Sequence, residues 1–174
     1  MSKNEFQSRV VVSGVGPDGK SCVVSDANTT ERAATPVATL NDVLSVAAVP
    51  VPVTSDVFVQ TDEYQVIPPK NGLKVLVACF PPDKEWQSDP ELYSAALAAT
   101  GASETNSDVA HGFHTTDTVD VITVLSGELF AVLETEEVRL LPGDTFVQRG
   151  TAHAWSNRSD GPTVAVLTMI DGAR

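Results

Sequence analysis

The chain has little basic charge. Its 174 residues include 11 Lys and Arg against 23 Asp and Glu, for a net charge of −12. Nucleic acids and anionic membranes are bound through basic surfaces. The sequence therefore predicts neither of them as a partner, and it disfavours highly anionic substrates unless an arginine or a metal offsets the negative field locally.

Cysteine and long apolar runs are also scarce. The two cysteines, Cys22 and Cys79, lie in apolar strand-like runs, which predicts buried, reduced thiols rather than a disulfide framework. No apolar run approaches the length needed to span a membrane, and the first ten residues contain no apolar core of a signal peptide. The expected location is the cytoplasm.

The composition is that of an ordinary globular protein, with 42% hydrophobic and 20% charged residues. The length predicts a single domain spanning 1–174, in which 1–70 form an N-terminal hairpin and an extended arm and 71–174 form the core. Two β-rich runs, 9–15 and 21–25, flank the turn sequence GPDGK and predict a β-hairpin. For 40–46 the pattern leaves a strand and a short helix open.

A short helix is predicted over 90–100. Asp89 is a suitable N-cap, Pro90 suits the first helical position, and Gly101 suits the end of the helix. We expect this helix to dock on the core through the face that carries Leu92, Ala95, Ala96 and Ala99.

The C-terminal half has the pattern of a β protein. Turn sequences such as SGE, PGD and NRSDGP separate runs of strand length, which favours a sandwich or barrel. The runs are 121–125, 129–133, 137–141, 145–149, 153–157 and 164–170, and the LKVLVACF run at 73–80 precedes them. The expected fold is mainly β, with one or two short helices.

The chain's three histidines, His111, His114 and His153, all lie between 111 and 157. Side chains alternate between the two faces of a strand. From His114, one face carries Thr116, Thr118 and Asp120 and then Ile122 and Val124; from His153, one face carries Trp155 and Asn157. This pattern predicts a barrel interior that is polar at one end and apolar at the other.

Two imidazoles and one carboxylate on inward faces suggest two kinds of site. His114, Asp120 and His153 form a set that suits Fe(II), and also Zn, Mn or Ni. The same three side chains also suit a buried hydrogen-bonded network without a metal. The spacing leaves both interpretations open.

The stretch from His111 to Asn157 resembles the two sequence motifs of the cupin superfamily. The second motif ends in Pro-x-Gly, two residues, His, three residues and Asn. Here the corresponding residues are 148–150, His153 and Asn157, with Gln148 where the family usually has proline.

The first cupin motif contains His-x-His, then Glu, then six residues and Gly. Counted back from Gly127, Asp120 takes the position of the glutamate, His114 that of the first histidine and Thr116 that of the second. The resemblance covers residues 111–170.

Cupins are double-stranded β-helix barrels of the jelly-roll type, often dimeric, that hold a metal among three His and one Glu. The resemblance therefore implies a divalent metal (Fe, Mn, Zn or Ni) on His114, Asp120 and His153, with His111 as a further candidate because Thr116 replaces one ligand. It also implies a homodimer, for which the N-terminal hairpin offers apolar surface.

Three functions follow as hypotheses. The first is a metal-dependent oxidoreductase or lyase, such as a dioxygenase or decarboxylase, acting on a carbonyl- or carboxylate-bearing metabolite. The second is a metal-free isomerase or dehydratase, with His153 or His114 as the base and Asp120 orienting it. The third is a non-catalytic cupin that binds a small ligand. In each, the candidate substrate contacts are Thr116, Thr118, Gln148 and Trp155.

Overall fold

The computed structural model describes residues 6–30, 32–53, 64–98, 103–104 and 112–174. The strands before the helices are β1 (Arg9–Val15), β2 (Ser21–Asn28), β3 (Arg32–Ala34), β4 (Thr39–Val46) and β5 (Leu73–Phe80). The 3-10 helix η2 (Asp83–Glu85) and the helix α1 (Pro90–Ala98) follow. The remaining strands are β6 (Ser103–Glu104), β7 (His114–Thr115), β8 (Thr118–Ser126), β9 (Leu129–Val132), β10 (Glu137–Leu140), β11 (Thr145–Arg149), β12 (Ala154–Ser156) and β13 (Thr163–Asp171).

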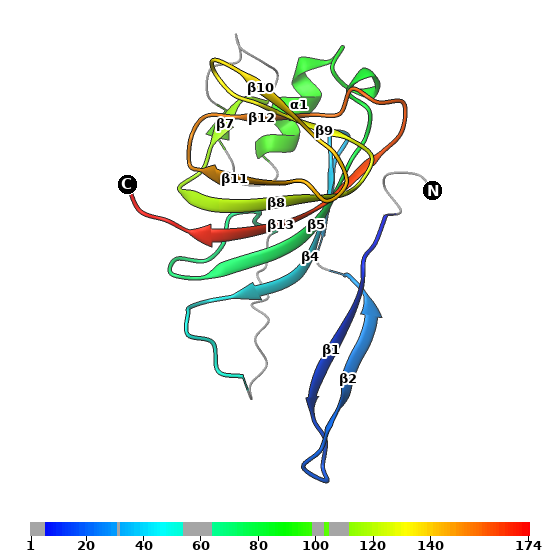
Figure 1. Cartoon of the computed structure of the whole chain (residues 1–174), viewed down its shortest axis with the longest axis vertical. Coiled ribbons are helices and arrows are strands. Elements are labelled where there is room, and N and C mark those ends of the chain that lie inside the picture. The colour runs from blue at the N-terminus through cyan, green and yellow to red at the C-terminus, as the bar shows by residue number, and fades with distance from the viewer. Residues whose placement is uncertain (1–5, 31, 54–63, 99–102, 105–111) are drawn as a thin grey trace.

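Two antiparallel sheets enclose the core (Figure 1). One has six strands in the order β11-β8-β13-β5-β4-β3, and the other has three in the order β10-β9-β12. In the larger sheet, Leu167 of β13 pairs with Leu76 of β5 on one side and with Ile122 of β8 on the other. These side chains pack in one cluster with Leu129 of the smaller sheet. The expected mainly β barrel of this jelly-roll type is confirmed, and the run 40–46, left open above, belongs to the strand β4.

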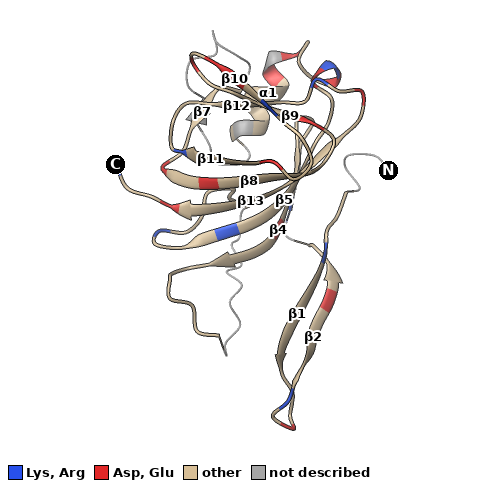
Figure 2. Ribbon diagram, viewed as in Figure 1, with Lys and Arg blue, Asp and Glu red and all other residues tan. Residues whose placement is uncertain are grey.

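The inner strands carry very few charged residues. β5, β8 and β13 have one each within their bounds or at their end, Lys74, Asp120 and Asp171 (Figure 2). Asp171 lies at the strand end, where its carboxylate accepts a hydrogen bond from the backbone N–H of Asn71. Lys74 is paired with Asp42 at 2.6 Å. Of the charged residues in these three strands, Asp120 is therefore the one whose role is explained neither by a position at the strand end nor by an ion pair.

The N-terminal hairpin is confirmed, and it projects away from the barrel (Figure 1). At its base, the hydroxyl of Thr29 donates a hydrogen bond to Oδ1 of Asn41 on β4 at 2.8 Å. Farther out, every residue of β2 is exposed to solvent. The prediction of burial is therefore wrong for Cys22, which lies on β2, and right for Cys79. Apolar alternation predicts strand pairing, but a projecting hairpin has no second layer to bury either face.

Helix α1 begins where the sequence predicts it, and Oδ1 of Asp89 accepts a hydrogen bond from the N–H of Glu91 at 3.1 Å. Its buried side chains are Tyr93 and Ala96, one turn apart. The predicted face was wrong at Ala95, which is exposed. The ring of Tyr93 packs on Trp86 with centroids 5.1 Å apart, so the face of α1 that carries Tyr93 lies toward the core. Leu92 is half-buried, and Ala99 with the predicted helix end lies outside the described residues.

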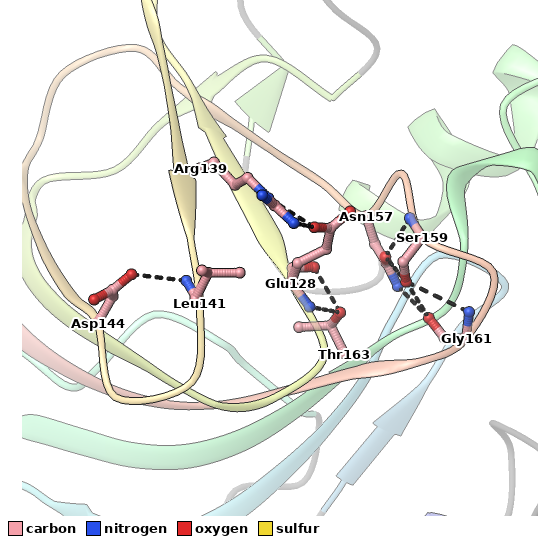
Figure 3. Close-up of polar contacts among 8 residues, drawn as sticks. All are labelled: Glu128, Arg139, Leu141, Asp144, Asn157, Ser159, Gly161 and Thr163. Carbon is pink, nitrogen blue, oxygen red and sulfur yellow. Dashed lines mark hydrogen bonds and ion pairs between the residues drawn. The ribbon is translucent and has the colours of Figure 1, made fainter.

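The side chain of Asn157, the last residue of the second motif, stabilises the turn before β13 through hydrogen bonds. It is 1% exposed, and its Nδ2 donates to the carbonyl oxygens of Phe80 and Gly161, each at 2.9 Å. Its Oδ1 accepts hydrogen bonds from the N–H and hydroxyl of Ser159 (Figure 3). These bonds tie the turn before β13 to the end of β5, so Asn157 has a role in the frame of the barrel.

No helix among the described residues has both the length and the apolar character required to cross a membrane.

Candidate active site

A cavity of about 110 Å³ lies inside the barrel. Five of the residues singled out in the sequence line it: His114, Thr116, Asp120, His153 and Trp155. The other lining residues are mostly apolar, and they are Thr35, Val37, Ala38, Leu40, Val66, Phe80, Tyr93, Ala96, Leu167 and Met169. The alternation of side chains along β8 and β12 therefore identified the polar side of the cavity.

The backbone brings His114 and His153 together. Each donates its N–H to the carbonyl oxygen of the other, at 2.9 and 3.0 Å, and their ring centroids lie 4.4 Å apart. Nδ1 of His114 lies 2.7 Å from the carbonyl oxygen of Gly112. Because a carbonyl oxygen only accepts, this contact places the proton of neutral His114 on Nδ1. Nε2 of His114 then carries a lone pair.

Gln148 holds His153 and is absent from the residues that line the cavity. The Nδ1 atom of His153 lies 2.9 Å from the carbonyl oxygen of Thr151 and 2.8 Å from Nε2 of Gln148. Gln148, only 2% exposed, also donates to the hydroxyl oxygen of Thr151 at 2.9 Å. The structure thus places this predicted substrate contact beside the histidine, where it orients the ring.

Asp120 lies on β8, 4% exposed, and its buried Oδ1 atom has no hydrogen-bond partner among the described residues. Burial raises the pKa of Asp120 to about 6, although a hydrogen bond from Thr118 acts in the opposite direction. The hydroxyl of Thr118 lies 2.7 Å from that of Thr116. Thr116, Thr118 and Asp120 therefore form a chain of hydrogen bonds, of which Thr116 and Asp120 reach the cavity.

Both imidazoles are uncharged near neutral pH. Burial, with a smaller contribution from neighbouring His114, lowers the pKa of His153 to about 4. Burial also lowers the pKa of His114. Among the described residues, neither ring is hydrogen-bonded to Asp120. The Gly112 carbonyl orients His114, and the Thr151 carbonyl and the Gln148 amide orient His153, in place of the expected carboxylate. Asp120, with a pKa of about 6, gains and loses a proton within about one unit of neutrality.

Trp155 forms part of the cavity wall and packs edge-on against His153, with centroids 5.3 Å apart. It also borders a larger cleft of about 510 Å³ between β12 and η2. None of the three residues in the expected ligand set lines that cleft. The smaller cavity is therefore the candidate active site.

The donor set only partly suits a metal. Two neutral imidazoles are suitable ligands. However, within the described part of the chain, no three His, Cys, Asp or Glu side chains gather closely enough to hold an ion. His111 lies outside the described residues. His114, Asp120 and His153 thus share a cavity without forming a complete ligand group.

Sequence reasoning missed most of the apolar wall. Val37 and Ala38 precede β4, Val66 precedes β5, and Tyr93 and Ala96 belong to α1. They meet the histidines only through long-range packing, which the strand pattern does not encode. The inward alternation of β13 was the one available signal, since it contains both Leu167 and Met169.

Residues 101–170 match the family model Cupin_2, described as a cupin domain. Two proteins of Diaporthe leptostromiformis, Phomopsin biosynthesis cluster protein C' and protein D, are each 40% identical to this chain over 91 residues. The matches cover 45% of this chain and 48% of each relative, so the chain spans about half the length of these proteins.

Solved structures show similarity at low identity. KdgF from Halomonas sp. has a TM-score of 0.45 and 12% identity, over 81% of this chain and 86% of that one. A sugar phosphate isomerase of the cupin superfamily from Silicibacter pomeroyi has a TM-score of 0.37 and 17% identity, over 56% of this chain and 50% of that one.

Proposed function

Because residues 101–170 form a cupin domain, we propose that this protein is a small-molecule enzyme that catalyses proton transfer in the barrel cavity. One observation carries the proposal: Asp120 lines the cavity with a buried, unpartnered Oδ1 atom and a pKa of about 6. A carboxylate with this pKa is a suitable general base near neutral pH, and strongly shifted groups in cavities are often catalytic.

The chemistry that suits these groups is isomerisation next to a carbonyl. Asp120 takes a proton from the carbon beside the carbonyl and returns it to a neighbouring atom, so the reaction needs no co-reactant. His153 is assigned the tautomer with its proton on Nε2: the Gln148 amide then donates both to Nδ1 of His153 and to the carbonyl oxygen of Thr151, so that this carbonyl needs no proton from the ring. That Nε2–H then donates to the substrate oxygen on which negative charge develops.

His114 and two further residues complete this assignment. Nε2 of His114 accepts a hydrogen bond from a substrate hydroxyl; if Asp120 returns the proton it has taken from carbon to that hydroxyl, the C–O bond breaks, water leaves and the reaction is a dehydration. Thr116 and Trp155 contact the substrate, since both line the cavity. Thr118 acts through Asp120, to which it is hydrogen-bonded.

Deuterium exchange tests this function without knowledge of the natural substrate. The protein is incubated in D₂O with small ketones such as cyclopentanone, and incorporation at the carbon beside the carbonyl is followed by NMR. We expect exchange above the buffer rate, lost in Asp120→Asn. The matched control is Asp160→Asn, because the Asp160 side chain is 98% exposed and lies on a loop outside the cavity.

The result that contradicts the proposal is equal exchange in the wild type and Asp120→Asn. Tight binding of ketones with no exchange in either protein would favour the non-catalytic ligand-binding cupin.

A metal-dependent enzyme is the second candidate. It is favoured by the main-chain carbonyls beside both Nδ1 atoms, which leave the two Nε2 atoms as the free ring nitrogens. His114, His153 and Asp120 would hold Fe, Mn, Zn or Ni, and the ion would supply Lewis-acid or oxygen chemistry of the dioxygenase, decarboxylase or lyase type. Because the described residues form no complete ligand group, we assign no step to it.

Elemental analysis of the untagged protein tests this second candidate. It predicts a stoichiometric divalent metal that is absent from His153→Ala, and exchange that is lost after chelation. The metal-free function predicts exchange that chelation leaves unchanged.

We also propose a homodimer in the cytoplasm. The hairpin formed by β1 and β2 exposes Val15, Val23 and Val24, each more than half accessible to solvent, and a second copy would cover them. Light scattering that gives the mass of one chain would contradict the dimer, and cell fractionation tests the location.

A further inference from the structure

We propose that the cavity selects small neutral molecules, with their hydrogen-bonding groups at one end of a hydrocarbon body, and excludes carboxylates and phosphates. This inference rests on the proposed function, because it names the substrate class of the same site. Three features carry it. They are the volume of the cavity, the separation of its lining into a polar and an apolar part, and the absence of Lys and Arg from the described lining residues.

The volume limits the size of the occupant. The cavity measures about 110 Å³. A cavity of about 150 Å³ lined by Leu, Ile and Phe side chains accommodates benzene. The part of an occupant that lies within these walls is therefore about the size of benzene or smaller, well below the drug-sized ligands that fill pockets of about 300 Å³ or more.

The lining limits the polarity of the occupant. The polar side chains available to it are His114 on β7, Asp120 on β8, Thr116 between these strands and His153 just before β12. The hydroxyls of Thr35 and Tyr93, which are also lining residues, donate to the carbonyl oxygens of Ala38 and Gly112. The remaining wall is made chiefly of aliphatic and aromatic side chains. A carbonyl or hydroxyl of the occupant can be satisfied only at the polar end, and the rest of the molecule must be apolar.

No cation is free to balance an anionic occupant. Among the described residues that line the cavity, there is no Lys or Arg. Lys74 is on the inner side of β5, opposite Met169 of β13, but its ammonium is already paired with Asp42 at 2.6 Å. It also donates to the carbonyl oxygen of Gln65 and lies 4.7 Å from the centroid of the Tyr64 ring.

The charge of the site itself also opposes an anion. Asp120 contributes the carboxyl group of the lining, and the chain as a whole has a net charge of −12. A carboxylate entering the cavity would lose its hydration without gaining a counterion, which is strongly unfavourable. Of the two substrate groups expected from the sequence, the cavity therefore accepts the carbonyl and excludes the carboxylate.

A matched pair of probes tests the selection by charge. Butyramide and butyrate have the same number of heavy atoms and nearly the same shape, and they differ in charge. Calorimetric titration of the full chain at pH 7.5 should show butyramide binding at least about tenfold more tightly than butyrate. Octanamide, which is also neutral but much longer, should bind more weakly than butyramide.

Two alanines of α1 provide the variants. Ala96 is buried and lines the cavity, whereas Ala95 on the same helix is exposed. Ala96→Phe should fill the cavity and abolish butyramide binding, and Ala95→Phe should bind as the wild type does. Circular dichroism of both variants confirms that each is folded.

Each of three results would overturn the inference. They are butyrate binding as tightly as butyramide, no binding of either probe, and undiminished binding in folded Ala96→Phe, which would place the probe elsewhere, such as the cleft beside β12. The proposed function has a separate test. Whichever probe binds, that function fails if Asp120→Asn exchanges deuterium as fast as the wild type.

Discussion

His114 and His153 are hydrogen-bonded to each other through their main chains in both directions, with ring centroids 4.4 Å apart. The pairing of two segments far apart in the sequence therefore sets the distance between the imidazoles. Because the backbone makes these bonds, replacing either ring leaves the frame in place. Variants at the two histidines and at Asp120 can accordingly be interpreted as changes in chemistry.

Asp120→Asn should stabilise the protein while abolishing exchange. Burial of the Asp120 carboxylate raises its pKa from 3.8 to about 6, so the folded state carries an unfavourable charge above pH 6. Removing that charge should raise the free energy of unfolding at pH 7.5 by about 1–3 kcal/mol. Urea unfolding of the wild type and variant measures the difference. A destabilised Asp120→Asn would show that the carboxylate is well accommodated in the fold.

The free energy of unfolding should change with pH in opposite directions in the variants His153→Gln and Asp120→Asn. The pKa of His153 falls from 6.5 to about 4 on folding, so the folded state binds fewer protons between these values and loses stability as the pH falls. For Asp120 the folded state binds more protons between pH 3.8 and 6, and stability rises as the pH falls. In the wild type the two effects largely cancel.

Removal of one group should expose the other. From pH 6.5 to 4, the free energy of unfolding of His153→Gln should rise and that of Asp120→Asn should fall, each by up to about 3 kcal/mol. The lowered pKa of His114 adds to the fall in the second variant. Urea unfolding at half-unit intervals of pH measures both slopes, and parallel curves for the two variants would contradict the assignment.

Thr118→Val should shift the pH dependence of deuterium exchange to higher pH. The hydroxyl of Thr118 hydrogen-bonds Asp120 and lowers its pKa. Without that bond, Asp120 should ionise about one unit higher, while the rate at high pH changes little. Thr118→Ser keeps the hydroxyl and should retain the wild-type midpoint. A purely structural role of Thr118 would lower the rate at every pH without moving the midpoint.

Gly112→Ala should disturb the histidine through Tyr93. Gly112 has φ of 80°, and a Cβ there would lie 1.8 Å from Cζ of Tyr93. The carbonyl oxygen of Gly112 also accepts hydrogen bonds from Nδ1 of His114 and the hydroxyl of Tyr93. We expect a loss of about 2–4 kcal/mol of unfolding free energy, together with loss of exchange.

The control for that substitution is Gly143→Ala. Gly143 also has positive φ, at 94°, but nothing lies within 4 Å of an added Cβ. It should lose about 1–2 kcal/mol from backbone strain and retain exchange. Equal losses in the two variants would indicate that the contact with Tyr93 has no effect.

The strands and the polar side of the cavity could be predicted from sequence because alternation is a local property. The inward face of β8 was predicted as Thr118, Asp120, Ile122 and Val124, and all four residues are buried. Contacts between distant segments were not predictable in this way. The exposure of Ala95 depends on Tyr93 packing against Trp86, and the role of Gln148 depends on a bond to His153 across a turn. The predicted site roles themselves remain predictions that the variants above test.

The proposed reacting groups and much of the wall around them come from different parts of the chain. His114, Asp120 and His153 lie within 101–170, the segment that matches the cupin model, whereas Ala38 and Ala96 lie before it. Selection for a new ligand could therefore alter the wall without altering these three residues. Two proteins descended from one ancestor could then share this segment nearly unchanged and bind different compounds. Sequence similarity over this segment would then indicate common ancestry and say little about which compound each protein binds.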